Sequence, residues 1–138
     1  MSDKNNRKYF TGPIRGGKEK ILLAEDNESV RILTRDMHRE YGYTVIEASD
    51  GEEALNKFNV HRDAISLIIL DVIMPKKNGK EVLHKAREIQ PGIKVIFTSG
   101  YPADLIQKEG IIEKGLNIII KPYPQQVLPQ KIRELLDH

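Results

Sequence analysis

The chain of 138 residues has the length of one domain, and its 39% hydrophobic and 30% charged residues are typical of a folded protein rather than a wholly disordered one. The absence of cysteine excludes a disulfide framework and a thiolate metal site, and no apolar run approaches the roughly 20 residues that cross a bilayer. The formal net charge is only +2 and the first residues are polar, unlike a signal peptide, so we expect a cytoplasmic protein without membrane contact.

Positive charge is concentrated at the start of the chain. The first twenty residues carry six basic and two acidic side chains, so a nucleic-acid or membrane patch is one interpretation. Apolar residues are few there, however, and Gly12, Pro13, Gly16 and Gly17 interrupt regular structure. We therefore expect a flexible basic leader or linker over residues 1–18, no nucleic-acid binding, and one domain over residues 19–138.

From residue 19 onward, short apolar runs alternate with longer segments of helical period. We expect strands at residues 20–24, 43–48, 65–70, 93–98 and 117–120, and helices after residue 27, after residue 50, after residue 79, at residues 102–114 and at residues 127–136. Apart from Ser66, the run at 65–70 is aliphatic without polar alternation, which is typical of a central parallel strand covered on both faces. Strict alternation predicts an α/β fold with a doubly wound five-stranded parallel sheet and right-handed crossovers.

Cap and turn residues set several of the expected boundaries. Asn27 can cap the first helix, in which Val30, Leu33 and Met37 recur at helical spacing, and that helix should stop before Gly42. In the last helix a proline at position 129 must lie in the first turn because it has no backbone N–H. The histidines follow no metal-ligand spacing, and we expect them to be surface residues without a role: His38, His61, His84 and His138.

Side chains with useful chemistry follow four of the five expected strands. They are Glu25 and Asp26 after the first, Asp71 after the third, Ser99 after the fourth and Lys121 after the fifth. Because ligands bind at the carboxyl ends of parallel strands in open sheets, we expect these side chains to meet at one edge. Three close carboxylates require a raised pKa or a cation, and all-oxygen ligation suits Mg²⁺. Lysine and serine beside such a cation suit a phosphoryl group.

Asp71 is the best candidate for a nucleophile that forms an aspartyl-phosphate, because it ends the central strand and a Met74-Pro75 turn follows. Glu25 and Asp26 are better suited to holding the metal. Taken singly, each of the five residues is more simply a turn former, a helix cap or a surface residue. The functional interpretation therefore depends on all five lying at one edge.

Five segments of the chain together resemble the receiver domain family of response regulators in two-component signalling, over about residues 20–136. They read ILLAEDN at 21–27, DGEEAL at 50–55, LDVIMP at 70–75 followed by Gly79, TSGY at 98–101 and KPY at 121–123. The Ser-Gly-Tyr form at 99–101 is most similar to receivers of hybrid sensor histidine kinases. The resemblance implies a (βα)5 flavodoxin-like receiver fold.

The resemblance also implies roles and partners. Asp71 would take a phosphoryl group from a phosphohistidine on a histidine kinase or histidine phosphotransfer domain. Mg²⁺ would be bound by Asp26, Asp71 and the backbone carbonyl of Ile73, with Glu25 acting through water. The phosphoryl oxygens would be bound by Ser99 and Lys121.

Conformational switching and assembly are further implications of the resemblance. Such a domain catalyses its own phosphorylation and dephosphorylation, and as part of a longer chain it would belong to a hybrid histidine kinase. The family usually has a cis peptide before the proline at Pro122, and a homodimer through the face of the fourth and fifth helices is implied. The family's aromatic switch residue falls at Ile118, so the usual aromatic relay is absent from this sequence.

Other functions remain open from the sequence. One is a receiver that serves for docking independently of phosphorylation. Another is a Mg²⁺-dependent phosphatase of the haloacid-dehalogenase type with an aspartate nucleophile, but that class needs an acid where Ile73 stands. A nucleotide-binding module is disfavoured because no Gly-rich phosphate loop follows the first strand.

Overall fold

The computed structural model describes residues 14–102 and 116–137, which contain a parallel sheet in the order β2-β1-β3-β4-β5. The strands are β1 (Lys20–Ala24), β2 (Thr44–Ala48), β3 (Ile65–Asp71), β4 (Lys94–Ser99) and β5 (Asn117–Ile120). The helices are α2 (Glu28–Glu40), α3 (Gly51–His61), α4 (Gly79–Ile89) and α6 (Val127–Leu136). The helix expected at 102–114 lies, apart from Pro102, outside the described residues. The strand order is that of the flavodoxin-like doubly wound fold, which confirms the predicted fold class.

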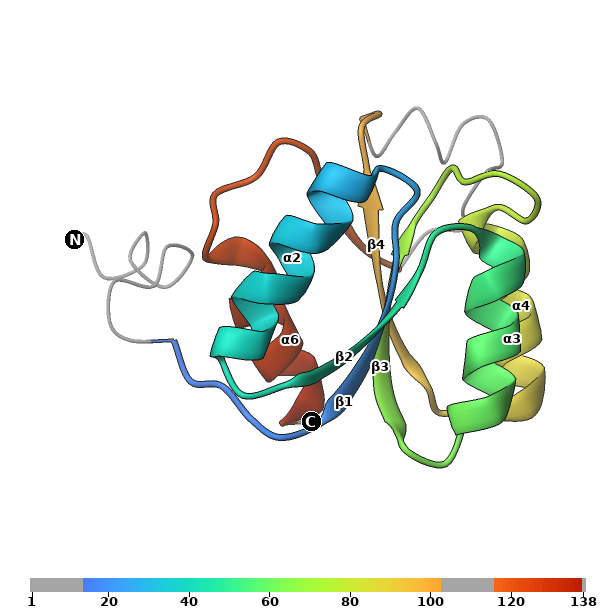
Figure 1. Cartoon of the computed structure of the whole chain (residues 1–138), viewed down its shortest axis with the longest axis horizontal. Helices are drawn as coiled ribbons and strands as arrows, with labels where there is room; N and C mark the ends of the chain where they lie inside the picture. Colours follow the sequence, from blue (N-terminus) through green and yellow to red (C-terminus); the bar gives the residue numbers. More distant parts are fainter. Residues whose placement is uncertain (1–13, 103–115, 138) are drawn as a thin grey trace.

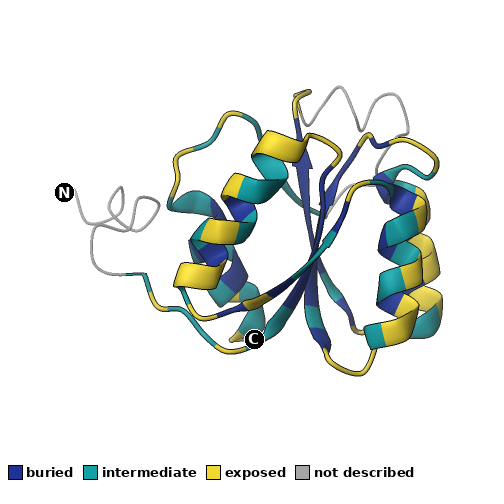
Figure 2. Cartoon of the chain, in the orientation of Figure 1, coloured by how far each residue is buried: buried dark blue, intermediate teal, exposed yellow. Residues whose placement is uncertain are grey.

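Helices cover both faces of the sheet, with α2 and α6 on one face and α3 and α4 on the other (Figure 1). Alternate residues of a strand point to opposite faces, so Leu67 and Ile69 of β3 join the core under α2 and α6. Ile68 and Leu70 join the core under α3 and α4. The strands are accordingly buried while the outer helix surfaces are exposed (Figure 2). Burial on both faces explains why the run at 65–70 lacks polar alternation.

Helix caps lie where the sequence predicts them. The Asn27 side chain accepts a backbone N–H of the first turn of α2 at 3.0 Å. After that helix ends, Gly42 has a φ of 99°, a conformation that glycine adopts without strain. Asn78 and Glu81 form a capping box at the start of α4, and Pro129 lies in the first turn of α6 as expected.

Strands β3 and β4 each extend one residue further than the sequence predicts. Asp71 and Ser99 are their last residues rather than the residues that follow them. Asp71 is paired with Thr98 of β4, and Ser99 is paired with Ile120 of β5. The sheet therefore fixes the backbone of both residues directly.

The described part of the expected leader, residues 14–18, contacts α2 and α6. The Gly17 N–H donates to the carbonyl of Tyr41 at 3.1 Å, and the Arg133 guanidinium of α6 donates to the Gly16 carbonyl at 3.1 Å. Arg133 also binds the Glu19 carboxylate at 2.8 Å, while Arg15 pairs with Asp137 at the end of α6. The function of the leader as a linker remains a prediction, and residues 1–13 lie outside the described part.

Helix α2 turns an unexpected set of side chains toward the sheet. Leu33 is 68% exposed, whereas Thr34 and His38 are buried. The expectation that His38 is a surface residue is therefore wrong: it follows Thr34 by four residues and lies on the same inward face. Its Nδ1 donates to the Thr34 carbonyl at 2.7 Å, and Nε2 has no hydrogen-bond partner within the described part of the chain. Burial lowers the pKa of His38.

The buried His38 ring predicts a loss of stability in mild acid. Because its pKa is lower in the folded protein than the ordinary 6.5, the unfolded chain binds a proton that the folded protein excludes. The free energy of unfolding should therefore fall as pH falls through 6.5, by at most about 1.4 kcal/mol per pH unit from this residue. Urea denaturation of wild type and His38→Phe at about pH 7.5 and pH 5.5 measures this contribution.

The comparison isolates His38 because every other titrating group is shared by the two proteins. His38→Phe should lose less stability between the two pH values than the wild type. Leu33→Ala is the control, because Leu33 is an exposed residue of the same helix that carries no titrating group, so its variant should keep the wild-type pH dependence. Equal pH dependence in the wild type and His38→Phe would contradict the interpretation.

Candidate functional site

The structure brings the five predicted site residues to one pocket of about 330 Å³ at the carboxyl edge of the sheet. The pocket is lined by Glu25, Asp26, Asn27, Asp71, Ile73, Ser99, Gly100, Tyr101 and Lys121. Ile73, predicted as a backbone ligand, is thus beside the other residues, and its side chain is 46% exposed. Asn27, Gly100 and Tyr101 were not predicted as site residues, although each lies within two residues of one that was.

Three carboxylates form a cluster in this pocket. One oxygen each of Glu25, Asp26 and Asp71 lies within 4.8 Å of the other two. Glu25 and Asp71 are buried, and Asp26 is exposed. The Glu25 N–H donates to the carbonyl of Ala48 at 3.0 Å, which continues the pairing of β1 and β2 past the end of β1. The oxygens are close enough for a single cation to contact several of them.

Lys121 lies between the two buried carboxylates. Its Nζ donates to Glu25 Oε1 at 2.7 Å and to Asp71 Oδ2 at 3.4 Å. Its backbone N–H donates to the Ser99 carbonyl at 2.7 Å, so the ends of β4 and β5 are joined just beyond their ladder. The Lys121-Pro122 peptide is cis, as the resemblance implies. The lysine therefore places its positive charge against the candidate nucleophile.

The Ser99 hydroxyl is directed to the loop after β4 rather than to the carboxylates. Ser99 Oγ donates to the Tyr101 carbonyl at 3.1 Å and accepts the Tyr101 N–H at 3.0 Å. The residue is only 1% exposed. Ser99 thus lines the pocket as expected, but its hydroxyl group donates its hydrogen bond to the loop after β4 in this structure.

Gly79 permits α4 to begin against the end of β3. A Cβ at this position would lie 2.8 Å from the Asp71 carbonyl oxygen and 2.9 Å from the Phe97 ring. The Gly79 N–H donates to the Val72 carbonyl at 2.8 Å. A larger residue would push the helix away from the backbone that carries Asp71, which explains why glycine stands here.

Burial and repulsion change the acidity of the cluster. Burial, and then the negative charge of Glu25, raise the pKa of Asp71 from 3.8 to about 7, although Lys121 opposes them. Burial acts on Glu25 in the same direction, but hydrogen bonds from Lys121 and the Asn27 N–H outweigh it and lower its pKa. Burial would lower the pKa of Lys121, yet Glu25 and Asp71 raise it overall. Of the two buried carboxyl groups, Asp71 therefore has the raised pKa and Glu25 the lowered one.

Comparisons with known proteins show which family shares this sequence pattern. Residues 21–133 match the family described as "Response regulator receiver domain". The chain is 31% identical over 121 residues to "Sensor kinase CckA" of Brucella abortus, which covers 88% of this chain and 13% of that protein. It is 27% identical over 118 residues to "Response regulator receiver protein CpdR" of the same organism, which covers 86% of this chain and 97% of the relative.

Solved structures agree with these matches. The receiver domain of the hybrid histidine kinase CckA is 36% identical, has a TM-score of 0.72, and covers 85% of this chain and 98% of its own. The chemotaxis protein CheY4 of Vibrio cholerae is 25% identical, has a TM-score of 0.75, and covers 86% of this chain and 98% of its own. Both the pattern and the fold thus point to one family.

The carboxylate cluster predicts opposite effects of two substitutions on the pKa of Asp71. Glu25→Gln should move that pKa from about 7 part of the way toward 3.8, because burial remains but the nearby negative charge is removed. Lys121→Met should raise it further, because an attracting charge is lost. A ¹³C NMR titration of the Asp71 carboxyl group without divalent cations measures both changes. Glu28→Gln, at an exposed glutamate of α2, is the control, and an unchanged or raised pKa in Glu25→Gln would contradict this account.

Proposed function

The chain belongs to the response regulator receiver domain family, and we propose that Asp71 accepts a phosphoryl group from a phosphohistidine in a two-component phosphorelay. One observation carries the proposal: Asp71 ends the central strand beside two further carboxylates and an ammonium group, in a pocket open to solvent. In the reaction an Asp71 carboxylate oxygen forms a bond to phosphorus as the bond from phosphorus to the histidine nitrogen breaks. The carboxylate must be ionised to attack.

The donor set fits Mg²⁺, which prefers hard oxygen ligands and retains several waters. We infer that Asp26 and Asp71 hold the ion directly, that the carbonyl of Ile73 completes the protein ligands, and that Glu25 acts through water. The bound cation supplies positive charge that offsets the negative charge of the phosphoryl oxygens. The same charge would favour ionised Asp71, whose pKa is raised by burial and by Glu25.

Lys121 and Ser99 would bind the phosphoryl oxygens. Lys121 Nζ is already 3.4 Å from Asp71 Oδ2, so its ammonium group lies beside the carboxylate that would carry the phosphoryl group. The Ser99 hydroxyl must first turn from the Tyr101 carbonyl, which it contacts at 3.1 Å. Phosphorylation adds up to about two negative charges, enough for new charged hydrogen bonds to move this loop. That movement is how we infer the domain switches conformation.

The partner is a histidine kinase or a histidine phosphotransfer domain. The chain spans only 13% of the sensor kinase CckA but 97% of the receiver protein CpdR, so both a hybrid kinase and a small separate receiver are represented among the relatives. No helix in the described residues is long and apolar enough to cross a membrane. We propose a cytoplasmic location, with neither nucleic acid nor membrane bound by this chain.

The proposed phosphoacceptor is tested by intact-mass measurement after treatment with acetyl phosphate and Mg²⁺. Wild-type protein should gain one phosphoryl group and Asp71→Asn should gain none, because the amide oxygen is a poor nucleophile. Asp63→Asn is the matched control. Asp63 is an exposed aspartate just before the first residue of β3, whereas Asp71 is the last, and Asp63 should not be needed for phosphorylation. Unmodified wild type, or equal modification of Asp71→Asn, would refute the assignment.

A homodimer is the second part of the proposal. It would form through the helix expected at 102–114 and α6, the fourth and fifth helices of the fold predicted from the sequence. Of this face, α6 is described, whereas residues 103–114 of the helix expected at 102–114 are not. Light scattering coupled to size-exclusion chromatography should show a larger fraction of dimer after phosphorylation than before. Asp71→Asn should show no such increase, and a phosphorylated wild type that stays monomeric at every concentration would contradict the dimer.

A further inference from the structure

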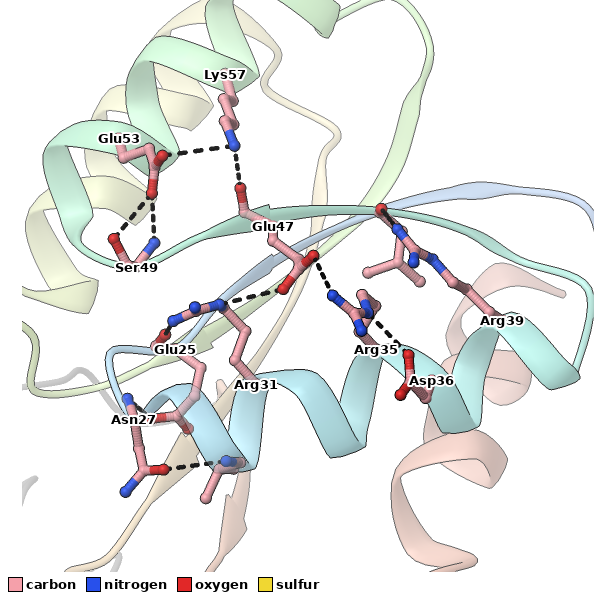
Figure 3. A network of polar contacts seen from close by, with 12 residues as sticks. Glu25, Asn27, Arg31, Arg35, Asp36, Arg39, Glu47, Ser49, Glu53 and Lys57 are labelled. Carbon is pink, nitrogen blue, oxygen red and sulfur yellow. Dashed lines mark hydrogen bonds and ion pairs between the residues drawn. The ribbon is translucent and has the colours of Figure 1, made fainter.

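Two arginines of α2 bind the same glutamate of β2 but differ in their second partner, which is the Glu25 carbonyl for Arg31 and the Asp36 carboxylate for Arg35 (Figure 3). Arg31 Nε donates to Glu47 Oε1 at 3.2 Å, and Arg35 Nη1 donates to Glu47 Oε2 at 3.0 Å. Only Arg31 also reaches the carboxylate site, where its Nη1 donates to the Glu25 carbonyl at 3.0 Å. Replacing each arginine in turn therefore distinguishes the effect of the Glu25 contact from the effect of the Glu47 contact.

Glu47 is a fixed anchor for Arg31. It lies on β2, which is paired with β1 along its whole length. The two arginines together lower the pKa of Glu47 against the effect of burial, so the carboxylate stays ionised. The backbone carbonyl of Glu47 accepts Lys57 Nζ of α3 at 2.5 Å. An arginine whose planar fork is held by such a carboxylate has little freedom left, and its side chain here is only 16% exposed.

The Glu25 peptide is held from both sides by this arrangement. Its N–H donates to the Ala48 carbonyl at 3.0 Å, and its carbonyl accepts a hydrogen bond from Arg31 at 3.0 Å. Ala48 lies on β2 and Arg31 binds Glu47 of β2, so both contacts connect Glu25 to that strand. The Asn27 N–H then donates to Glu25 Oε2 at 3.1 Å. The turn over residues 25–27, which carries Glu25 and Asp26, is thereby closed between β1 and α2.

We propose that Arg31 is a positioning residue for the cation site: anchored on Glu47, it holds the Glu25 carbonyl and so fixes the turn that presents Glu25 and Asp26 to Mg²⁺. This inference rests on the proposed function, because it needs the carboxylates to bind the cation. Arg31 touches none of the reacting atoms. Without it the turn loses one of its two ties to β2, and the carboxylates must be ordered by the cation itself.

The expected effect is a weaker Mg²⁺ site with unchanged chemistry once the site is filled. Partners that orient metal ligands typically change affinity by about 10- to 100-fold, so Arg31→Ala should raise the Mg²⁺ dissociation constant roughly tenfold or more. At saturating Mg²⁺ the final extent of phosphorylation by acetyl phosphate should equal that of the wild type. Isothermal titration calorimetry gives the affinity, and intact mass gives the Mg²⁺ dependence of phosphorylation.

Arg35→Ala is the matched control because it removes an arginine from the same helix and the same glutamate while leaving the Glu25 carbonyl contact in place. Its Mg²⁺ affinity should stay within about twofold of the wild type, well below the change expected for an orienting partner. Thermal unfolding of both variants reports any loss of stability that they share. Arg31→Lys keeps the charge but lacks the guanidinium fork, so its affinity should lie below the wild type and above Arg31→Ala.

The outcomes separate this inference from the function on which it rests. Equal Mg²⁺ affinities in Arg31→Ala and Arg35→Ala, with a phosphorylated wild type, overturn the positioning role alone. A wild type that neither binds Mg²⁺ nor becomes phosphorylated overturns the proposed function and the positioning role together. If Arg31→Ala does not fold, Arg31→Lys decides, and a wild-type affinity in that variant overturns the inference.

Discussion

The repulsion among Glu25, Asp26 and Asp71 is the interaction on which the site depends. Their carboxylate oxygens lie within 4.8 Å of one another, and two of the three residues are buried. A single ammonium group, that of Lys121, faces this cluster, yet burial first and then the negative charge of Glu25 raise the pKa of Asp71 to about 7. The fold tolerates this arrangement because Asp71 is the last residue of β3 and the Glu25 N–H pairs with the Ala48 carbonyl of β2. A site with spare negative charge and fixed geometry is suited to binding a divalent ion and then a phosphoryl group.

Much of this arrangement was predictable because it follows from backbone rules. Buried parallel strands read as aliphatic runs, and the polar residue at the end of each run must lie at the ligand edge. That reasoning brings Asp71 and Lys121 together although fifty residues separate them. The resemblance to receivers and the α/β fold are confirmed by the family match and the strand order. The roles of the individual site residues remain proposals.

The features that sequence reasoning missed all depend on where a side chain points in the folded chain. His38 was expected at the surface because histidine is polar, whereas its place on α2, one turn after Thr34, is what buries it. The direction of the Ser99 hydroxyl is set by a loop two residues further on, and no pattern in the sequence states it. Arg31 reads as one charge on an amphipathic helix. Its contact with the Glu25 carbonyl becomes visible only when β1, α2 and β2 are placed together.

The contacts of Arg133 fix the segment that leads into β1 on one side of the sheet. Arg133 binds Gly16, Glu19 and Tyr43, which lie just before β1 and β2, whereas Asp71 ends β3 at the opposite edge of the sheet. Residues 16–19 are thus held on the side of the domain remote from the acidic pocket. A second protein can therefore approach Asp71 without passing this segment.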